Sequence, residues 1–152
     1  MLTIRKANPS DAKVLRDLYD NHLTSRPLQS AEEPPCIEAW EEKLAEFNAS
    51  PRYHLLVGEV NDQIVSSVTL IVVENLTRSL RPYAVIENVV THSDHRGKGY
   101  AQILMNRASA IATKSNCYKI MLMTGSKENS ALSFYESCGF NKDDKTAFIK
   151  WL

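Results

Sequence analysis

The feature that most constrains the fold is an apolar run that leads directly into a basic loop with two glycines. Residues 83–91 read YAVIENVVT and predict a strand, and residues 95–101 read HRGKGYA and open an amphipathic segment that predicts a helix. Gly97 and Gly99 let the backbone adopt positive φ and let a ligand come close. Free amides at the start of a helix attract phosphate. This order therefore predicts an anion-binding loop, although a basic strand-to-helix turn with no ligand would carry the same pattern.

Length, charge and cysteine content exclude several other classes of protein. The 152 residues predict one domain over residues 1–152, with one core. The 18 lysines and arginines balance the 18 aspartates and glutamates, which argues against nucleic acid or a membrane surface as a partner. Cys36, Cys117 and Cys138 lack a metal-binding spacing, so we expect no metal and a reduced compartment. With no membrane-spanning run and a strand-like start, MLTIRK, instead of a signal peptide, the sequence favours the cytoplasm.

Hydrophobic periodicity predicts strands and helices in the order βααβββαβαβ. Strands are expected at residues 2–6, 53–60, 64–73, 83–91, 118–123 and 147–152. Helices are expected at residues 12–22, 37–47, 98–114 and 128–138, the last of them ended by Gly139. This order predicts an α/β or α+β fold, with one mixed sheet of about six to seven strands and helices on both faces.

Two short motifs resemble the GNAT superfamily of N-acetyltransferases. Residues 96–101, RGKGYA, are similar to its acyl-CoA signature, Gln/Arg-x-x-Gly-x-Gly/Ala, which lies at the start of the helix after the fourth strand. Residues 129–140, NSALSFYESCGF, are similar to a second block, a helix that ends in a Tyr followed by three residues and Gly-Phe. The resemblance covers essentially the whole chain, because the order of the flanking elements also fits. It implies a GNAT-like domain, in which the fourth and fifth strands splay apart.

The resemblance implies acetyl-CoA as the co-substrate and assigns residues to it. The pantetheine arm would lie in the gap between the splayed strands, against the backbone of Val89, Val90 and Thr91, as an extended peptide pairs with a strand edge. The pyrophosphate would be held by the basic loop and the helix start, at Arg96, Gly97, Lys98, Gly99, Tyr100 and Ala101.

Asn129 would also contact the coenzyme, but its register departs from the family pattern. The family's asparagine is usually seven residues before the tyrosine of the second block, where this chain has Glu128, and Asn129 is six residues before it. One residue turns a helix by about 100°. Asn129 could therefore act instead as the helix N-cap.

Tyr135 and Glu87 are the expected catalytic residues. Many family members place a tyrosine at the position of Tyr135, and a phenol, protonated at neutral pH, can donate a proton to the leaving thiolate. Glu87 lies in an otherwise apolar strand, two residues before the pantetheine segment, and is the candidate general base, directly or through a water. The alternatives are a packed helix tyrosine and a glutamate that pairs with an arginine or faces solvent. His92 and His95 lie at the phosphate end and are better explained as loop residues.

The acceptor side is less well defined by the sequence. In this family the first two helices and the loop between the third and fourth strands line the acceptor pocket. The candidates there are Glu32, Glu33, Glu38, Arg78, Arg81 and Tyr83. The carboxylates would suit a cationic amine and the arginines an acid or a phosphate, but all could be ordinary surface residues. Residues 116–120, NCYKI, resemble eukaryotic glucosamine-phosphate N-acetyltransferases, yet lie in a structural strand.

We therefore expect an enzyme that moves an acetyl group from acetyl-CoA to a primary amine of a small molecule or peptide. Direct transfer is favoured, because no cysteine lies in a Cys/His arrangement suited to a covalent intermediate. One alternative is a non-catalytic acyl-CoA sensor with the same fold. A phosphate-binding nucleotide protein is disfavoured, because the loop lacks the Gly-Lys-Ser/Thr ending of a P-loop. A homodimer is left open.

Overall fold

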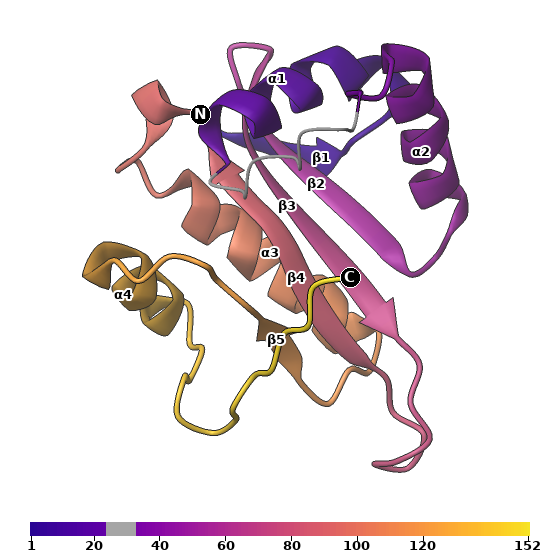
Figure 1. The fold of residues 1–152 in the computed structure, drawn as a ribbon, viewed down its shortest axis with the longest axis vertical. Coiled ribbons are helices and arrows are strands. Elements are labelled where there is room, and N and C mark those ends of the chain that lie inside the picture. Colours follow the sequence, from indigo (N-terminus) through magenta and orange to yellow (C-terminus); the bar gives the residue numbers. More distant parts are fainter. Residues whose placement is uncertain (24–32) are drawn as a thin grey trace.

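The computed structural model describes residues 1–23 and 33–152. Its strands form one mixed sheet in the order β1-β2-β3-β4-β5, with helices on both faces (Figure 1), which confirms the expected fold class. The strands are β1 (Thr3–Lys6), β2 (Tyr53–Val60), β3 (Gln63–Val73), β4 (Tyr83–Thr91) and β5 (Ile120–Leu122). The helices are α1 (Ala12–His22), α2 (Ile37–Ala49), α3 (Tyr100–Lys114) and α4 (Asn129–Ser137), with 3-10 turns at Pro9–Asp11 and Ser93–His95.

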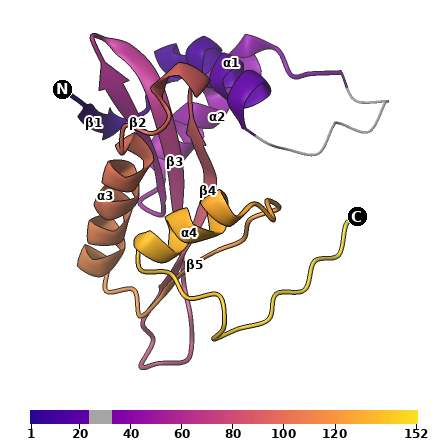
Figure 2. The ribbon, with the colours of Figure 1, turned by 90° about the vertical axis from the view of Figure 1, so that its left-hand side faces the viewer.

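The two faces of the sheet pack against different helices, because successive side chains of a strand point to opposite faces. On one face, Val68 and Leu70 of β3 pack against Leu104 of α3. On the other face, Leu55 and Val57 of β2 share a cluster with residues of α1 and α2. Figure 2 shows α3 on one side of the sheet and α1 and α2 on the other. The sheet therefore lies between two helix layers, each with its own hydrophobic cluster.

The fourth and fifth strands part after a short pairing. β5 runs parallel to β4 and pairs with it only over Ala84–Ile86. Beyond this point, β4 continues to Thr91 with β3 as its one neighbour among the described strands. Asn88, at a φ of 52°, lies in a bulge in which the β3 register shifts, and a bulge bends the strand that carries it. The expected splay is therefore confirmed, with the irregularity at the asparagine.

The C-terminal strand expected at residues 147–152 is wrong. The structure forms no strand there, and the sheet has five strands instead of six to seven. Residues 141–152 are all exposed, and Figure 2 shows them running away from the sheet. The pattern AFIKWL suits a strand, but the polar stretch NKDDKT before it carries the chain away from the β5 edge. The fifth strand is also shorter than expected, at three residues, Ile120–Leu122.

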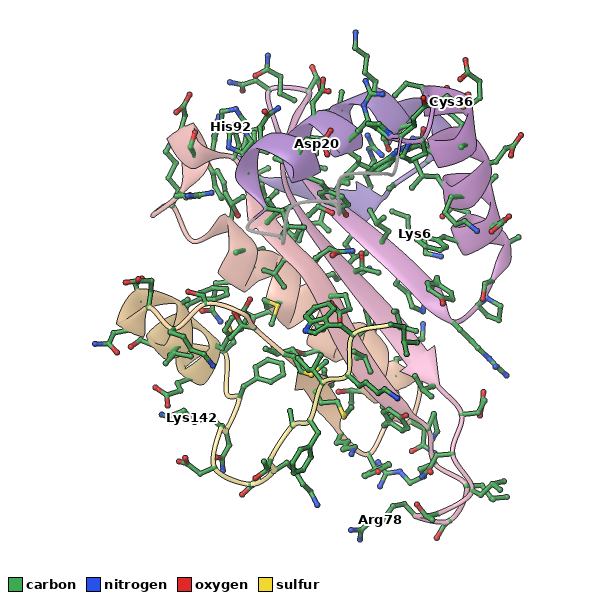
Figure 3. The ribbon with its side chains drawn as sticks, viewed as in Figure 1. Lys6, Asp20, Cys36, Arg78, His92 and Lys142 are labelled. Carbon is green, nitrogen blue, oxygen red and sulfur yellow. The ribbon has the colours of Figure 1, made fainter. Side chains whose placement is uncertain are left out.

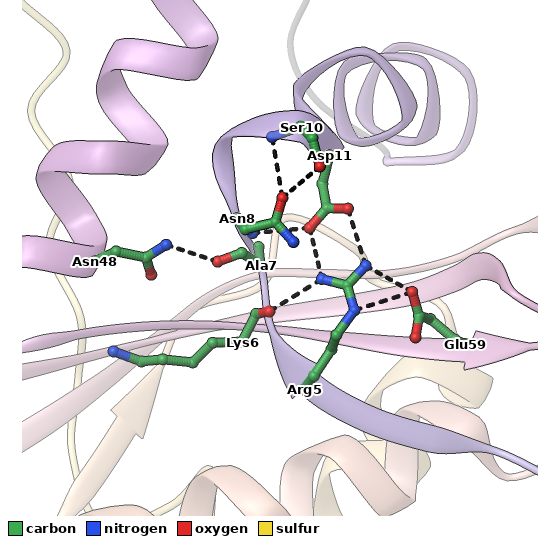
Figure 4. A network of polar contacts seen from close by, with 8 residues as sticks. All are labelled: Arg5, Lys6, Ala7, Asn8, Ser10, Asp11, Asn48 and Glu59. Atoms are coloured by element: carbon green, nitrogen blue, oxygen red, sulfur yellow. Dashed lines mark hydrogen bonds and ion pairs between the residues drawn. The ribbon is translucent and has the colours of Figure 1, made fainter.

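A partly buried ionic network ties the first strand to the start of α1 (Figure 4). The Arg5 guanidinium donates to Asp11 Oδ2 at 2.6 Å, to Asp11 Oδ1 at 2.9 Å and to Glu59 Oε1 at 2.6 Å. Asp11 also accepts from the Asn8 amide at 2.8 Å and closes a capping box. Burial alone would raise the pKa of Asp11, but the hydrogen bonds from Arg5 and Asn8 outweigh it and hold that pKa below its ordinary value. The network fixes β1 against β2 at one edge of the sheet.

Candidate active site

The glycine loop after β4 is open to an incoming ligand. Gly97 has a φ of 74° and Gly99 a φ of 76°, the left-handed conformation that favours glycine. Gly99 is the N-cap of α3, so the helix begins at Tyr100 and Lys98 lies in the loop. A Cβ added at either glycine would meet no atom within 4 Å. The first amides of α3 lack partners within the helix, so the loop and the helix start fit a phosphate or pyrophosphate.

The two cations of the loop hold the backbone in place. Arg96 donates from Nε to the Thr91 carbonyl at 3.1 Å and from a terminal nitrogen to the His22 carbonyl at 3.0 Å. Lys98 Nζ donates to the Asp94 carbonyl at 2.9 Å. Both side chains thus brace the loop in this structure, while their positive charge stays beside the glycines.

The end of β4 offers a strand edge at the splay. The His92 amide donates to the Val65 carbonyl of β3 at 2.9 Å, and Val90 pairs with Ser67. Since backbone groups alternate between the two edges of a strand, those of Val89 and Thr91 point away from β3. The Val90 carbonyl faces β3 and accepts from Ser66 Oγ at 2.9 Å. Of the three residues expected to hold the pantetheine arm, the outer two therefore present their polar groups to the open edge.

Glu87 and Tyr135 lie on opposite faces of the sheet, and Glu87 comes directly after the last β4 residue that pairs with β5. Glu87 pairs across the sheet with Thr69, on the face covered by α1 and α2. Tyr135, on α4, packs against the core cluster of the α3 face. Burial raises the pKa of Tyr135, and the charges of Cys138 and Glu87 raise it further. The Glu87 carboxylate thus acts on the phenol from the opposite face, and neither side chain forms a hydrogen bond or an ion pair within the described chain.

Asn129 begins α4 and is exposed. Glu128 is the N-cap residue, without a side-chain capping bond, so the alternative role of Asn129 as the N-cap is wrong. The Glu128 amide instead donates to Ser126 Oγ at 3.3 Å. A contact between Asn129 and the coenzyme stays a prediction.

The first two helices cover a polar group of side chains that the sequence reasoning did not single out. Tyr19 Oη lies 3.2 Å from Ser67 Oγ, and the Tyr19 and Trp40 rings lie 5.9 Å apart. Within the described residues, Trp40 Nε1 is buried without a hydrogen-bond partner, and the buried Thr69 hydroxyl interacts with the Tyr19 phenol. Thr69 is the cross-strand neighbour of Glu87. The signal was present in the sequence: Ser67 and Thr69, two residues apart in an apolar strand, share one face.

The other acceptor candidates are dispersed. Glu32 lies outside the described residues, while Glu33 precedes α2 and Glu38 lies in its first turn, and both are exposed. Arg81 donates to the Asn116 and Cys117 carbonyls, and Arg78 lies over the Tyr118 ring. Figure 3 shows Arg78 and His92 at opposite ends of the molecule. The two arginines therefore stabilise the hairpin between β3 and β4, and they do not line the gap between β4 and β5.

This combination of a splayed sheet and a glycine loop at a helix start defines an acyl-CoA-dependent transferase. The model of the acetyltransferase (GNAT) family matches residues 15–140. The chain therefore belongs to the acetyltransferase (GNAT) family and is an acetyl-CoA-dependent N-acyltransferase. Within the described residues, no helix is long and apolar enough to cross a membrane.

Individual relatives share the fold and much of the chain. A spermidine N(1)-acetyltransferase of Vibrio cholerae is 28% identical over 91% of this chain and 78% of its own. A glucosamine 6-phosphate N-acetyltransferase of Trypanosoma brucei brucei is 32% identical, over 55% of this chain and 54% of its own. Among solved structures, a protein of Agrobacterium tumefaciens provisionally described as an acetyltransferase is 36% identical, with a TM-score of 0.83 over 98% of this chain and 99% of its own.

Proposed function

We propose that this protein transfers the acetyl group of acetyl-CoA directly to a primary amine, with Glu87 as general base and Tyr135 as general acid. The observation that carries the proposal is their position on opposite faces of the sheet, at the point where β4 and β5 part. The acceptor would approach from the α1 and α2 face, beside Glu87. The thiol of the coenzyme would leave on the face of Tyr135.

The pyrophosphate of acetyl-CoA would bind at the glycine loop and the first turn of α3. Its pantetheine amides would pair with the open edge of β4 at Val89 and Thr91, as an added strand does. The phosphate end of the coenzyme would lie beyond Thr91, at the C-terminal end of β4. The thioester would therefore lie back toward the middle of β4, near Glu87. The absence of a Cβ at Gly97 and Gly99 is what leaves the loop accessible.

The proposed reaction balances without another reactant. The amine lone pair attacks the thioester carbonyl carbon and forms the C–N bond, while Glu87 accepts the amine proton directly or through a water. The C–S bond then breaks, and the thiolate takes the hydroxyl proton of Tyr135. Glu87 returns its proton to the phenolate through solvent. The raised pKa of Tyr135 supports this role, since it keeps the phenol protonated before transfer.

A small cationic or amino-sugar acceptor is the substrate class that we propose. Spermidine and glucosamine 6-phosphate are the substrates in the names of two relatives. The Trp40 indole N–H is buried without a partner among the described residues and suits a polar acceptor on the α1 and α2 face, where Glu87 also lies. The three free cysteines support the reducing cytoplasm as the compartment.

The test is the release of free CoA thiol from acetyl-CoA in the presence of polyamines, amino sugars, amino acids and peptides, each in turn. Turnover with one class, and its loss in the Glu87→Gln and Tyr135→Phe variants, would support the proposal. Binding of acetyl-CoA with no turnover across the panel would favour the alternative, a non-catalytic acyl-CoA sensor.

A further inference from the structure

Three of the four histidines gather at one end of β4, where α1 meets the loop that leads to the glycines. His22 is the last residue of α1, and its ring centroid lies 4.0 Å from that of His92. The His92 ring lies 5.7 Å from that of His95, which in turn lies 6.2 Å from Tyr100 at the start of α3. Figure 3 shows His92 between the end of α1 and this loop. A row of rings thus links the end of α1 to the start of α3.

Two of these rings accept hydrogen bonds from the loop backbone. His22 Nδ1 accepts from the Ser93 amide at 3.3 Å, and His92 Nδ1 accepts from the Asp94 amide at 3.2 Å. Only a neutral imidazole has a nitrogen lone pair to offer, because both nitrogens of the imidazolium carry hydrogen. Both contacts therefore require neutral rings.

The same junction holds Arg96. Its guanidinium donates to the His22 carbonyl at 3.0 Å and to the Thr91 carbonyl at 3.1 Å. The end of α1 is thus joined to the residue that precedes Gly97 and to the open edge of β4. A shift of the loop away from α1 would move the two parts of the structure that are proposed to hold acetyl-CoA.

The charges around His22 favour its neutral form. Burial lowers the pKa of His22, and the charges of His92 and Arg96 lower it further, while Asp94 opposes them. The groups that face His22 are therefore His92, Arg96 and Asp94, all on the segment packed against the end of α1. Two protonated rings 4.0 Å apart beside a guanidinium would repel one another.

We propose that His22 and His92 form a neutral imidazole pair that positions the acetyl-CoA loop, and that protonation of the pair releases the loop and weakens acetyl-CoA binding. The proposal rests on the proposed function, since it concerns the affinity of the donor site. His22 and His92 are positioning residues, because they act on the coenzyme through Ser93, Asp94 and Arg96. Acetyl-CoA affinity should therefore fall as the pH decreases through the range in which histidine titrates.

The test compares acetyl-CoA affinity at about pH 7.5 and about pH 5.5, a range that spans histidine titration. The double variant His22→Asn/His92→Asn places an amide oxygen near each Nδ1 and cannot be protonated. Its acetyl-CoA affinity should fall less than that of the wild type between the higher and the lower pH. The loss of one hydrogen bond corresponds to about fivefold in affinity. The coenzyme phosphates titrate equally in both proteins, so the difference isolates the pair. His54→Asn, which removes the one histidine outside this cluster, on β2, should keep the wild-type pH dependence.

A second measurement needs no ligand. In the free wild type, the hydrogen-exchange protection factors of the Ser93 and Asp94 amides should fall between about pH 7.5 and about pH 5.5, and in the double variant they should not. Equal pH dependence of affinity in the two proteins, or constant protection in the wild type, would overturn the proposal. If acetyl-CoA does not bind the wild type at either pH, the proposed function fails, and the protection factors alone decide on the pair.

Discussion

The Tyr135 hydroxyl allows the enzyme to be distinguished from a sensor by a single substitution. The sulfur gains negative charge only as the C–S bond breaks, so a proton donor aimed at it acts mainly in the transition state. Tyr135→Phe keeps the ring, which packs against the core. Acetyl-CoA affinity should change little, while kcat should fall about 10²-fold if protonation limits the rate. Steady-state kinetics and calorimetry test this. A variant with full activity would make Tyr135 a packing residue.

Glu87 carries the second residue-scale prediction. A general base must be ionised to accept a proton, so activity should decline on the acidic side of the pH–rate profile. At saturating acetyl-CoA, Glu87→Gln keeps the shape of the side chain and should abolish this acidic limb of kcat, with the rate at neutral pH lowered by about 10²-fold or more. Rate measurements across the pH range test both points. A retained acidic limb at a near-normal rate would assign the base role to another residue or to a water chain.

At the residue scale, the sequence predicts the residues that belong to a recognisable motif. It does not predict residues that come together only when separate elements pack. Gly97 and Gly99 were read from their spacing, and the structure gives both a positive φ. Trp40 and Thr69 come from an amphipathic helix and an apolar strand, where each looks like ordinary core. Their polar atoms are seen to be buried together only once α1 packs on β3 and α2 packs on β2.

The glycine loop allows a prediction at the scale of an element. In Gly99→Val the added side chain would meet no protein atom but would occupy the space left for the coenzyme, in a left-handed conformation that valine resists. Acetyl-CoA affinity should fall at least about tenfold, or about 1.4 kcal/mol. Gly139→Val is the matched control, since Gly139 has a φ of 87°, has equal space around it and lies at the end of α4. Calorimetry should show weaker binding for Gly99→Val alone. Equal affinities would remove the loop from the binding site.

The network that joins β1, the first 3-10 turn and β2 predicts the acid sensitivity of the fold. The pKa of Asp11 is held below its ordinary value of 3.8. Its contribution to stability is therefore present above the unfolded-state pKa and is lost as the pH falls through the lower folded-state pKa. Asp11→Asn should lower the free energy of unfolding at neutral pH by about 1–3 kcal/mol and remove this part of the acid dependence. Urea denaturation at several pH values tests this.

An exposed ion pair provides the control for this network. Lys43 and Glu46 pair on the surface of α2, with side chains 59% and 63% exposed. Glu46→Gln should change the free energy of unfolding by less than about 1 kcal/mol, because water screens such pairs. If Glu46→Gln lowered the free energy of unfolding as much as Asp11→Asn, burial would not explain the stabilisation by the Arg5 network.

Helices and strands are predictable where the local sequence pattern determines the structure. They are less predictable where the structure depends on pairing between distant strands. The helices and the strands up to β4 follow hydrophobic periodicity, and the structure places them close to the expected bounds. The length of β5 depends on how many residues of β4 are available to pair with it. That pairing stops at Ile86, just before the bulge at Asn88. The segment at residues 147–152 has a strand pattern but pairs with no strand of the described chain, although the outer edge of β5 has no neighbour there. A strand is stabilised by pairing with a neighbouring strand, and the sequence of a segment does not show which strand it will pair with.

For the whole molecule, this segment motivates a prediction about assembly. Phe148 is 92% exposed and Leu152 is 111% exposed, an unfavourable arrangement for large apolar side chains. β5 ends the sheet, so one of its edges has no neighbouring strand among the described elements. We predict a homodimer in which this segment of each copy adds to the β5 edge of the other, which would complete the strand pattern. Light scattering should give twice the chain mass of 17.2 kDa.

Phe148→Asp tests this assembly, because a carboxylate in an apolar interface is costly to bury. The variant should shift to the monomer mass at concentrations where the wild type is dimeric. Leu76→Asp is the matched control: Leu76 is 90% exposed on the hairpin between β3 and β4, away from the C-terminal segment. It should leave the dimer intact. A monomeric wild type, or a dimer that Phe148→Asp does not weaken, would contradict the exchange. A dimer lost in Leu76→Asp alone would place the interface at the hairpin.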